Sequence, residues 1–318
     1  MDEGKPIAQC LVVQDTKFVD VGSQDEVQAR WALSAGNDGN TSTSKLPIRF
    51  VRNGAIIVPG MTDSHAHTLE YGFTKLLPIE GTRTVKETVN RVRNFIEADT
   101  ELLHNKTRLI EGWGWDHTKW VEALWPVADA FEKDSVVAGR PIILQSKDGH
   151  ALWVSKAILS KMEPIPEEVE GGVIVRDASG QPTGVLLDNA QELANALRPE
   201  PTYEQLEQRF NLTVKDAVKY GLTSIHDAGF DPISLSFFRR YAVVYGLRRI
   251  RIYGMTHFNE SAEYWGDKVD KLIGAGNGRL TARSVKIFAD GKQFIWSSFA
   301  TPLKLDNIKA LYVPVVQL

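Results

Sequence analysis

The pattern of apolar and polar positions predicts strands and helices in alternation. Short apolar runs bounded by polar or glycine-rich stretches predict strands. These runs are residues 7–14, 17–21, 48–51, 55–58, 109–115, 141–146, 173–176, 184–187, 222–226, 249–255 and 285–288. Runs 7–14 and 17–21 flank a polar turn, as do 173–176 and 184–187, so each of these two pairs predicts a hairpin.

Helix starts are marked by two capping boxes, Thr84-x-x-Glu87 and Thr202-x-x-Gln205. Apolar residues recur at helical spacing after each of them. They are Val85, Val89, Val92 and Ile96 after the first box, and Leu206, Phe210, Val214 and Ala217 after the second. A further helix is predicted between Asp231-Pro232 and Gly246, and a short one at 25–34.

The order of these elements changes along the chain. From Gly221 onward strands alternate strictly with helices, which is typical of parallel βαβ units. The polar stretch 35–45 predicts a loop. The sequence therefore predicts an α/β protein with a parallel sheet in its C-terminal part.

Composition limits the kinds of partner. The chain has 318 residues, 43% of them hydrophobic and 24% charged, which is typical of a globular protein with one large domain or a large and a small one. The formal net charge of −3 and the scattered basic residues argue against a nucleic-acid surface. The single Cys10 excludes an internal disulfide and a cysteine-built zinc site. A polar N-terminus and the lack of an apolar run near the roughly 20 residues needed for a membrane span lead us to expect a cytoplasmic protein.

His65 and His67 form the candidate site with the clearest chemistry. They follow the apolar run 55–58 in Pro59-Gly60-Met61-Thr62-Asp63-Ser64-His65-Ala66-His67. Residues i and i+2 of an extended chain point to the same side, so both imidazoles could bind one cation. Two neutral imidazoles suit Zn²⁺ or a similar divalent ion. Asp63 is expected to orient the histidines rather than to bind the metal.

Five stretches of the chain together resemble the amidohydrolase-3 branch of the amidohydrolase superfamily, the YtcJ-like metal-dependent hydrolases. Each is a modest signal alone, and they occur in the family's order. They are Pro59 to His67; Gly112 to Asp116; Asp148-Gly149-His150 with Trp153 to Ala157; Gly171 to Asp177 with Pro182 to Gly184; and Gly221 to Gly229 with Val285 to Gly291.

The resemblance implies a fold and its domains. We expect a partial (β/α)8 barrel of the TIM type, with residues 55–63, 222–226, 249–255 and 285–289 as its first four strands. Residues 68–220 would be a long insertion after the first strand, within a barrel domain spanning 55–318. Residues 1–54 would form part of a small β-sandwich. Strand 285–289 would be an open parallel edge.

The resemblance also implies functional residues. Lys286 would be a metal ligand beside His65 and His67, because a carboxylated lysine bridges two ions in related enzymes. The alternative is a lysine whose stem crosses the sheet edge and whose amine reaches solvent. His150 and His226 would contact the substrate. For His150 a loop histidine without function explains the position equally well, and for His226 the alternative is a hydrogen bond to Asp227 that orients the strand end. The expected cofactor is one or two divalent ions, with zinc favoured.

One departure from the family bears on activity. The pattern requires further histidines on the fifth and sixth strands and a general-base aspartate on the eighth, and the residues after Gly291 do not match it. No catalytic residue is therefore assigned, and we expect a chain truncated at the C-terminus and also at the N-terminus. The leading hypothesis is a metal-dependent hydrolase of non-peptide carbon–nitrogen bonds in a small amide- or formamide-like substrate. The rival is a non-catalytic fragment or pseudo-enzyme, and homodimer formation stays open.

Overall fold

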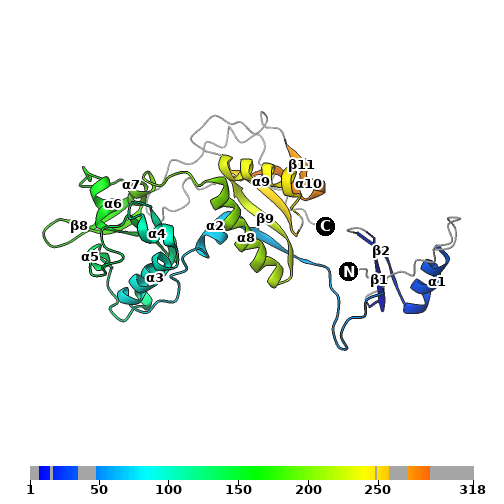
Figure 1. Cartoon of the computed structure of the whole chain (residues 1–318). Coiled ribbons are helices and arrows are strands. Elements are labelled where there is room, and N and C mark those ends of the chain that lie inside the picture. Colours follow the sequence, from blue (N-terminus) through cyan, green and yellow to red (C-terminus); the bar gives the residue numbers. More distant parts are fainter. Residues whose placement is uncertain (1–6, 15–16, 35–47, 248, 258–270, 287–318) are drawn as a thin grey trace. The chain divides into compact units, whose positions relative to one another are not determined.

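The computed structural model describes residues 7–14, 17–34, 48–247, 249–257 and 271–286. The chain divides into two compact units, Met1–Gly60 and Met61–Leu318. In Figure 1 the described parts are coloured along the sequence. Within the described residues no helix is long and apolar enough to cross a membrane.

The first unit contains the predicted hairpin and the short helix. Strands β1 (Cys10–Gln14) and β2 (Lys17–Gly22) pair antiparallel, and α1 (Gln24–Ser34) follows. The Arg30 guanidinium donates to both oxygens of the Asp20 carboxylate, at 2.8 and 2.9 Å, and so ties α1 to β2. The turn at Asp15-Thr16 and the predicted loop 35–45 lie outside the described residues.

The second unit contains a sheet with four parallel strands. Its strand order is β11-β12-β10-β9-β3, in which β3 (Met61–Ala66), β9 (Leu222–Phe230), β10 (Arg251–His257) and β12 (Leu280–Lys286) are parallel neighbours. This pairing confirms the predicted order of the four segments. We call it the parallel sheet, although the short β11 (Leu272–Gly274) pairs antiparallel with β12.

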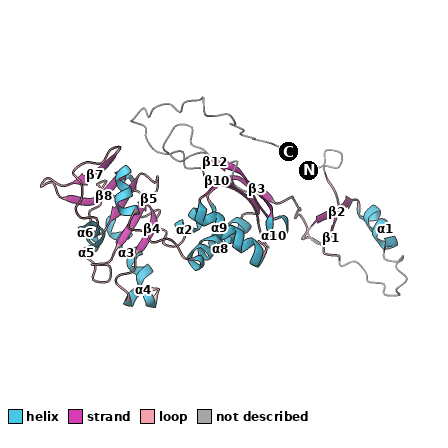
Figure 2. Cartoon of the chain, turned by 90° about the horizontal axis from the view of Figure 1, so that it is seen from above, coloured by secondary structure: helices cyan, strands magenta, loops and turns pink. Residues whose placement is uncertain are grey.

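Two long helices cover one face of the parallel sheet, as Figure 2 shows. Helix α8 (Tyr203–Lys219) begins at the predicted capping box, with both reciprocal hydrogen bonds formed. Helix α9 (Pro232–Tyr245) begins where the Asp231 side chain accepts from Ser234 N, and ends at Gly246 with φ 72°. Their buried faces form a core with the sheet, and its members include Phe210, Phe230, Phe237, Phe238, Ile225, Ile252 and Leu280. The short α10 (Ala275–Gly278) precedes β12.

A second sheet lies within residues 68–220, and we call it the insertion sheet. Its order is β4-β5-β6-β8-β7, with β4 parallel to β5 and the other pairs antiparallel. The strands are β4 (Ile110–Trp115), β5 (Ile142–Ser146), β6 (Ala151–Val154), β7 (Gly172–Arg176) and β8 (Pro182–Asp188). The hairpin predicted between 173–176 and 184–187 is confirmed.

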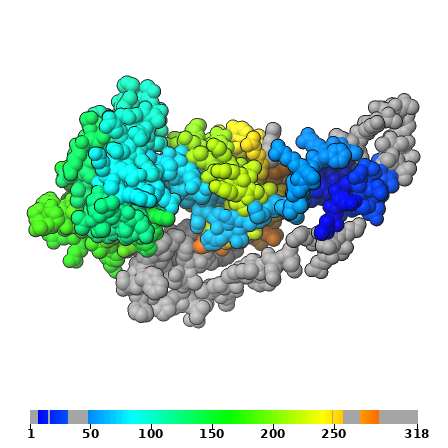
Figure 3. Space-filling model, turned by 90° about the horizontal axis from the view of Figure 1, so that it is seen from below, coloured from blue at the N-terminus to red at the C-terminus, as the bar shows by residue number. Residues whose placement is uncertain are grey.

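The other helical segments of the second unit lie between Thr68 and Asn195. They are α2 (Thr68–Thr74), α3 (Val85–Glu97), α4 (Thr100–His104), η1 (His117–Lys119), α5 (Asp129–Glu132), α6 (Lys156–Lys161), η2 (Asn189–Gln191) and α7 (Glu192–Asn195). In the space-filling view of Figure 3, the residues coloured cyan to green form a continuous surface.

Alternate side chains of the insertion sheet belong to two different cores. Ile142 and Leu144 of β5 pack in one cluster with Trp153, whereas Ile143 packs in the other with Leu152. Trp115 and Trp120 belong to the first cluster and are buried. The insertion sheet is thus covered by apolar side chains on both faces.

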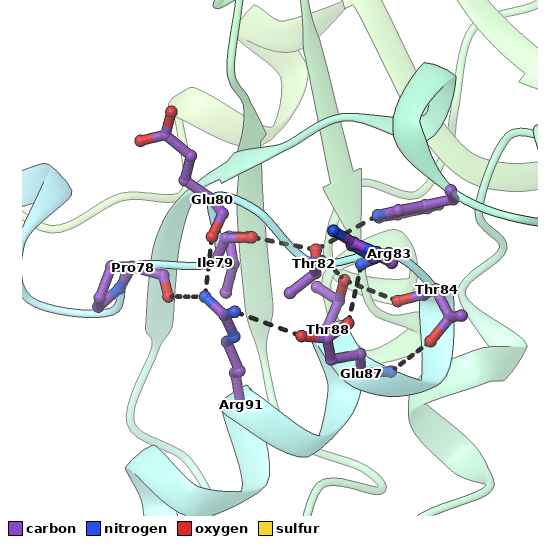
Figure 4. A network of polar contacts seen from close by, with 10 residues as sticks. Pro78, Ile79, Glu80, Thr82, Arg83, Thr84, Glu87, Thr88 and Arg91 are labelled. Atoms are coloured by element: carbon purple, nitrogen blue, oxygen red, sulfur yellow. Dashed lines mark hydrogen bonds and ion pairs between the residues drawn. The ribbon is translucent and has the colours of Figure 1, made fainter.

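A hydrogen-bond network fixes the segment that leads into α3 (Figure 4). Arg91 on α3 donates to the carbonyl oxygens of Pro78 and Glu80 and forms an ion pair with Glu87. Thr84 caps α3 as predicted by accepting from Glu87 N at 2.9 Å. The Glu87 carboxylate accepts from Arg83 N instead of Thr84 N, so the reciprocal half of the predicted capping box is shifted by one residue.

Two predicted strands are wrong. Residues 48–51 and 55–58 form no strand, and Phe50 and Ile56 are each 84% exposed. An apolar run forms a strand only where a neighbouring strand completes its hydrogen bonds. Strand β3 first reaches a hydrogen-bonding neighbour at Met61, whose N–H donates to Gly221 O. The strand therefore starts later than the predicted 55–63.

The edge of the parallel sheet also differs from the prediction. Strand β12 begins at Leu280, earlier than the predicted 285, because Leu280 and Ala282 pack against the helices despite the polar residues between them. The prediction that this strand is an open edge is partly wrong, because β11 pairs with β12 at Leu272 and Ala282. Residues 287–289 of the predicted strand, and the tail after Gly291, lie outside the described residues.

Candidate functional site

His65 and His67 lie at the carboxyl end of β3. His65 belongs to the strand, and His67 is the N-cap of α2 with an extended backbone (φ −119°, ψ 96°). The extended geometry places both imidazoles on one side, with ring centroids 5.7 Å apart and planes inclined by 74°. Asp63 Oδ1 accepts from His65 N at 3.0 Å, so Asp63 fixes the backbone that carries the pair.

Asp227 on β9 connects this strand end to its neighbour. Its side chain is 2% exposed, and its two oxygens accept from Thr68 N at 2.9 Å and Gly229 N at 3.1 Å. Ala66 and Asp227 are register partners in the β3–β9 pair. Sequence reasoning mentioned Asp227 only as a partner for His226, although an aspartate inside an apolar strand is itself a signal of a buried role.

The electrostatic surroundings of His67 favour a neutral imidazole. Burial is the main cause that lowers the pKa of His67, and the nearby His65 and Lys286 lower it further. The Asp227 carboxylate opposes this shift. Lys286 is the last residue of β12, and strands β10 and β9 lie between β12 and β3 in the sheet. A neutral imidazole keeps the lone pair that a metal ion requires.

Glu70 on α2 is a titratable group that sequence reasoning missed. Burial of its carboxyl among protein atoms raises the pKa of Glu70 to about 7, and the carboxylates of Asp227 and Asp231 add to the shift. The residue remains accessible to water, which weakens the effect of burial. The guanidinium of Arg209 acts in the opposite direction and lies over the Phe73 ring at 4.8 Å. The end of β3 therefore has acidic as well as imidazole groups.

The other predicted residues lie elsewhere. His226 is on β9, where its ring centroid lies 5.1 Å from that of Tyr253 on β10. The oxygens of Asp227 bind Thr68 and Gly229, and no His226–Asp227 hydrogen bond is seen among the described residues. His150 belongs to the insertion sheet, where its Nδ1 lies 2.9 Å from Asp188 Oδ1. The structure brings together His65 and His67, places Lys286 at the end of β12, and gives His150 and His226 different neighbours.

The donors at the β3 end fit part of a zinc site. Two imidazole nitrogens on one side of the chain are ligands that Zn²⁺ takes, and a four-coordinate site needs further ligands. In the described part of the chain no group of three or more histidine, cysteine, aspartate or glutamate side chains is arranged to hold a metal ion. The pair is therefore a partial donor set.

The sequence profile of the amidohydrolase family matches residues 53–303, which is most of the chain. The chain belongs to this family. It is 26% identical over 293 residues to the putative amidohydrolase YtcJ of Bacillus subtilis, covering 89% of this chain and 50% of YtcJ. It is 24% identical over 299 residues to the N-substituted formamide deformylase of Arthrobacter pascens, covering 91% and 52%.

Further similarities agree with this assignment. Protein LONG AFTER FAR-RED 3 of Arabidopsis thaliana is 28% identical over 231 residues, covering 72% of this chain and 36% of that protein. The crystal structure of an uncharacterized metal-dependent hydrolase from Pyrococcus horikoshii has a similar fold, with a TM-score of 0.59 at 19% identity, covering 89% of this chain and 51% of the other. The chain spans about half the length of the first relatives it matches.

Proposed function

We propose that this chain carries part of the active site of a metal-dependent amidohydrolase that cleaves carbon–nitrogen bonds other than peptide bonds. The observation that carries the proposal is the His65–His67 pair, at the carboxyl end of a strand whose sheet has the predicted parallel order. Enzymes with parallel (β/α)8 barrels hold their sites at this end of the strands. The proposed substrate is a small amide- or formamide-like molecule, in line with the name of the Arthrobacter relative.

The proposed architecture is the first half of a (β/α)8 barrel. Four parallel strands with helices on one face support it, because the second face of such a sheet is the barrel interior. Residues 68–220 are proposed to be the insertion that follows the first barrel strand, and residues 1–54 part of a small β-sandwich. The proposed location of the protein is the cytoplasm.

His65 and His67 are proposed to hold a divalent ion, with zinc favoured. Lys286 is proposed as a further ligand after carboxylation, and its place at the carboxyl end of β12, a strand of the same parallel sheet, supports this. A divalent ion, when bound, supplies Lewis acidity that polarises a carbonyl group and acidifies a water molecule. Asp63 and Asp227 hold the two strand ends in place, so the imidazoles are positioned before an ion arrives.

Zinc titration of the full chain by calorimetry tests the ion site. We expect the His65→Ala/His67→Ala variant to bind zinc at least about 100-fold more weakly, which corresponds to about 2.7 kcal/mol. His104→Ala is the matched control, because His104 is an exposed histidine on α4 whose Nδ1 contacts Thr100 O. Equal zinc affinity of the double variant and the wild type would contradict the proposal.

A second measurement separates the enzyme from its rival, a metal-binding chain without turnover. Zinc-loaded protein is incubated with N-butylformamide, and the release of butylamine is followed. The hydrolase hypothesis expects release that is lost in the double variant. The rival expects zinc binding that depends on His65 and His67 without release of amine.

A further inference from the structure

The guanidinium of Arg209 has no partner of opposite charge in the part of the chain that the structure describes. Arg209 lies on α8 and is partly buried, and its Nε is inaccessible to solvent and lacks a hydrogen-bond acceptor. No hydrogen bond or ion pair joins this side chain to another described residue. Burial of a charged group without a partner is costly, so an unpaired guanidinium in this place requires a reason other than stability.

The backbone that carries Arg209 is fixed against α2. Arg209 packs on Gly72 so closely that a side chain at position 72 would not fit. One turn further along α8, the Thr213 hydroxyl donates to Thr68 O. Figure 2 shows the two helices side by side. Because α2 begins directly after His67, Arg209 has a set position relative to the strand end that carries the histidines.

The ring of Phe73 on α2 holds the guanidinium. The Arg209 Cζ lies over this ring, 4.8 Å from its centroid. A cation over an aromatic ring is attracted by the charge distribution of the ring, which uses none of its N–H groups. Phe73 follows His67 by six residues, which is about 9 Å along the axis of a helix. A short flexible molecule spans that length.

The acidic groups that act on Arg209 do not pair with it. Burial lowers the pKa of Arg209, and the carboxylates of Glu111 and Glu70 oppose this shift. Glu111 on β4 forms its ion pair with Arg198, with Oε1 and Nε 2.9 Å apart. Glu70 lies three residues before Phe73, hence on the same side of α2, and forms no ion pair with any described residue. Burial raises the pKa of Glu70, which makes this carboxyl a weaker competitor for the guanidinium.

A carboxylate is the ligand that matches an unpaired guanidinium. The planar fork of arginine donates two parallel N–H bonds to the two oxygens of such a group. In a partly buried place this charge-assisted pair is stronger than in water, and it removes the cost of the unpaired charge. A purely structural arginine finds its acceptors within the fold, as Arg140 does with the carbonyl oxygens of Leu102 and Leu103.

We propose that Arg209 binds the carboxylate of the substrate, and that the substrate is an N-formyl or N-acyl compound with a carboxylate a few bonds from its amide nitrogen. This inference rests on the proposed function for the amide part of the substrate. The anion contact itself stands on the unpaired guanidinium and on the packing of α2 and α8. Arg209 determines specificity in this role, and it forms and breaks no covalent bond.

The contact is tested by NMR on the full chain with ¹⁵N-labelled arginine in the presence of zinc. The probes are 4-formamidobutanoate and N-butylformamide, which carry a carboxylate and a methyl group, respectively, at the same end of the molecule. We expect only 4-formamidobutanoate to shift the Nε–H resonance of Arg209, which is identified by its loss in Arg209→Lys. The resonance of Arg239, exposed on α9, and a titration with sodium chloride are the controls. Equal responses to the two probes, or no response, would overturn the proposal.

The affinities of variants measure what the arginine fork contributes. In calorimetry, Arg209→Gln should bind 4-formamidobutanoate at least about 10-fold more weakly than the wild type, and N-butylformamide equally well. Arg209→Lys keeps the charge and loses the fork, so its affinity for 4-formamidobutanoate should lie between the two. Arg239→Gln is the matched control and should behave as the wild type. Unchanged affinity of Arg209→Gln for 4-formamidobutanoate would overturn the inference, and so would an equal loss for both probes.

Zinc titration of the same samples separates this inference from the proposed function. The titration reports on His65 and His67, whereas the Arg209 resonance reports on the anion. Normal zinc binding without a shift of the Arg209 resonance would overturn the inference and leave the proposed function standing. A shift of that resonance without zinc binding would overturn the proposed metal site and support the anion contact.

Discussion

The two sheets of the second unit differ in how their faces are covered. In the insertion sheet, neighbouring residues of β5 pack into separate cores, and every residue of β6 is buried. In the parallel sheet, Ile252 and Leu280 pack on the helices, whereas Tyr253, on the opposite face of β10, is 46% exposed. The described residues thus bury both faces of one sheet and one face of the other.

The comparison shows which side chains are held in place by packing and which are accessible to a ligand. Parallel sheets normally have both faces covered, and in a barrel the second face is the interior that leads to the site. His226 lies beside Tyr253 on the less buried part of the sheet. Substitutions should therefore affect stability strongly in the insertion and more weakly on this face.

The largest effect is expected for Trp153→Ala. Trp153 is fully buried and stacks on Phe131 with ring centroids 4.3 Å apart. Its removal leaves a large cavity and should lower the free energy of unfolding by about 3–5 kcal/mol. Tyr253→Ala on the parallel sheet is the matched control and should cost less than about 1 kcal/mol. Urea unfolding measures both, and equal costs would break the comparison between the two sheets.

An intermediate effect is expected for Asp227→Ala. The change leaves the N–H groups of Thr68 and Gly229 without their carboxylate acceptor, in a buried place. Each buried unsatisfied donor costs about 1–3 kcal/mol, so the free energy of unfolding should fall by a few kcal/mol. Asp63→Ala removes one hydrogen bond to an exposed backbone N–H and should cost less. A larger loss for Asp63→Ala than for Asp227→Ala in urea unfolding would contradict this interpretation.

The smallest effect is expected for Glu70→Gln, and it depends on pH. The pKa of Glu70 in the folded protein, about 7, lies above the ordinary value of 4.5. Between these values the unfolded chain releases the proton that the folded chain keeps, so stability falls as the pH rises from about 4.5 to about 7. The glutamine variant lacks this loss, and its advantage should be larger at pH 8 than at pH 5.

Because Glu70 is accessible to water, the change should be smaller than the shift alone implies. Thermal unfolding at both pH values measures it. Glu204→Gln, an exposed glutamate in the first turn of α8, is the control, and the pKa of Glu204 is lowered by its backbone hydrogen bond. If the stability of Glu70→Gln relative to the wild type were lower at pH 8 than at pH 5, the prediction would be wrong.

The sequence predicted correctly those elements whose limits are set by residues a few positions apart. Capping residues such as Thr202 and Asp231 define helix starts through hydrogen bonds within a few residues, and both are confirmed. Strand limits depend on the neighbour, which explains why β3 and β12 begin at positions other than those predicted. The exposed run 55–58 shows that apolar character alone does not define a strand.

The candidate site was predictable to the extent that it lies in one stretch. His65 and His67 are two residues apart in the sequence, and the predicted order of the parallel strands places Lys286 at the end of β12. Glu70 and Asp227 could not be assigned in the same way. Their surroundings arise from contacts between β9 and α2, such as the hydrogen bond from Thr68 N to Asp227 Oδ2, which joins residues 159 positions apart. The pattern of residues within one short stretch of sequence does not predict contacts between segments this far apart.

The close contact of α2 and α8 has a consequence for the long segment between them. A Cβ atom on Gly72 would lie 1.9 Å from Arg209 O, so these helices meet backbone to backbone. The Thr213 hydroxyl adds a 2.6 Å hydrogen bond to Thr68 O. The chain therefore leaves α2 for residues 75–202 and returns to α8 at one tightly joined point. The two ends of this long segment are fixed to each other, so a change of length within it need not displace the strand that carries His65.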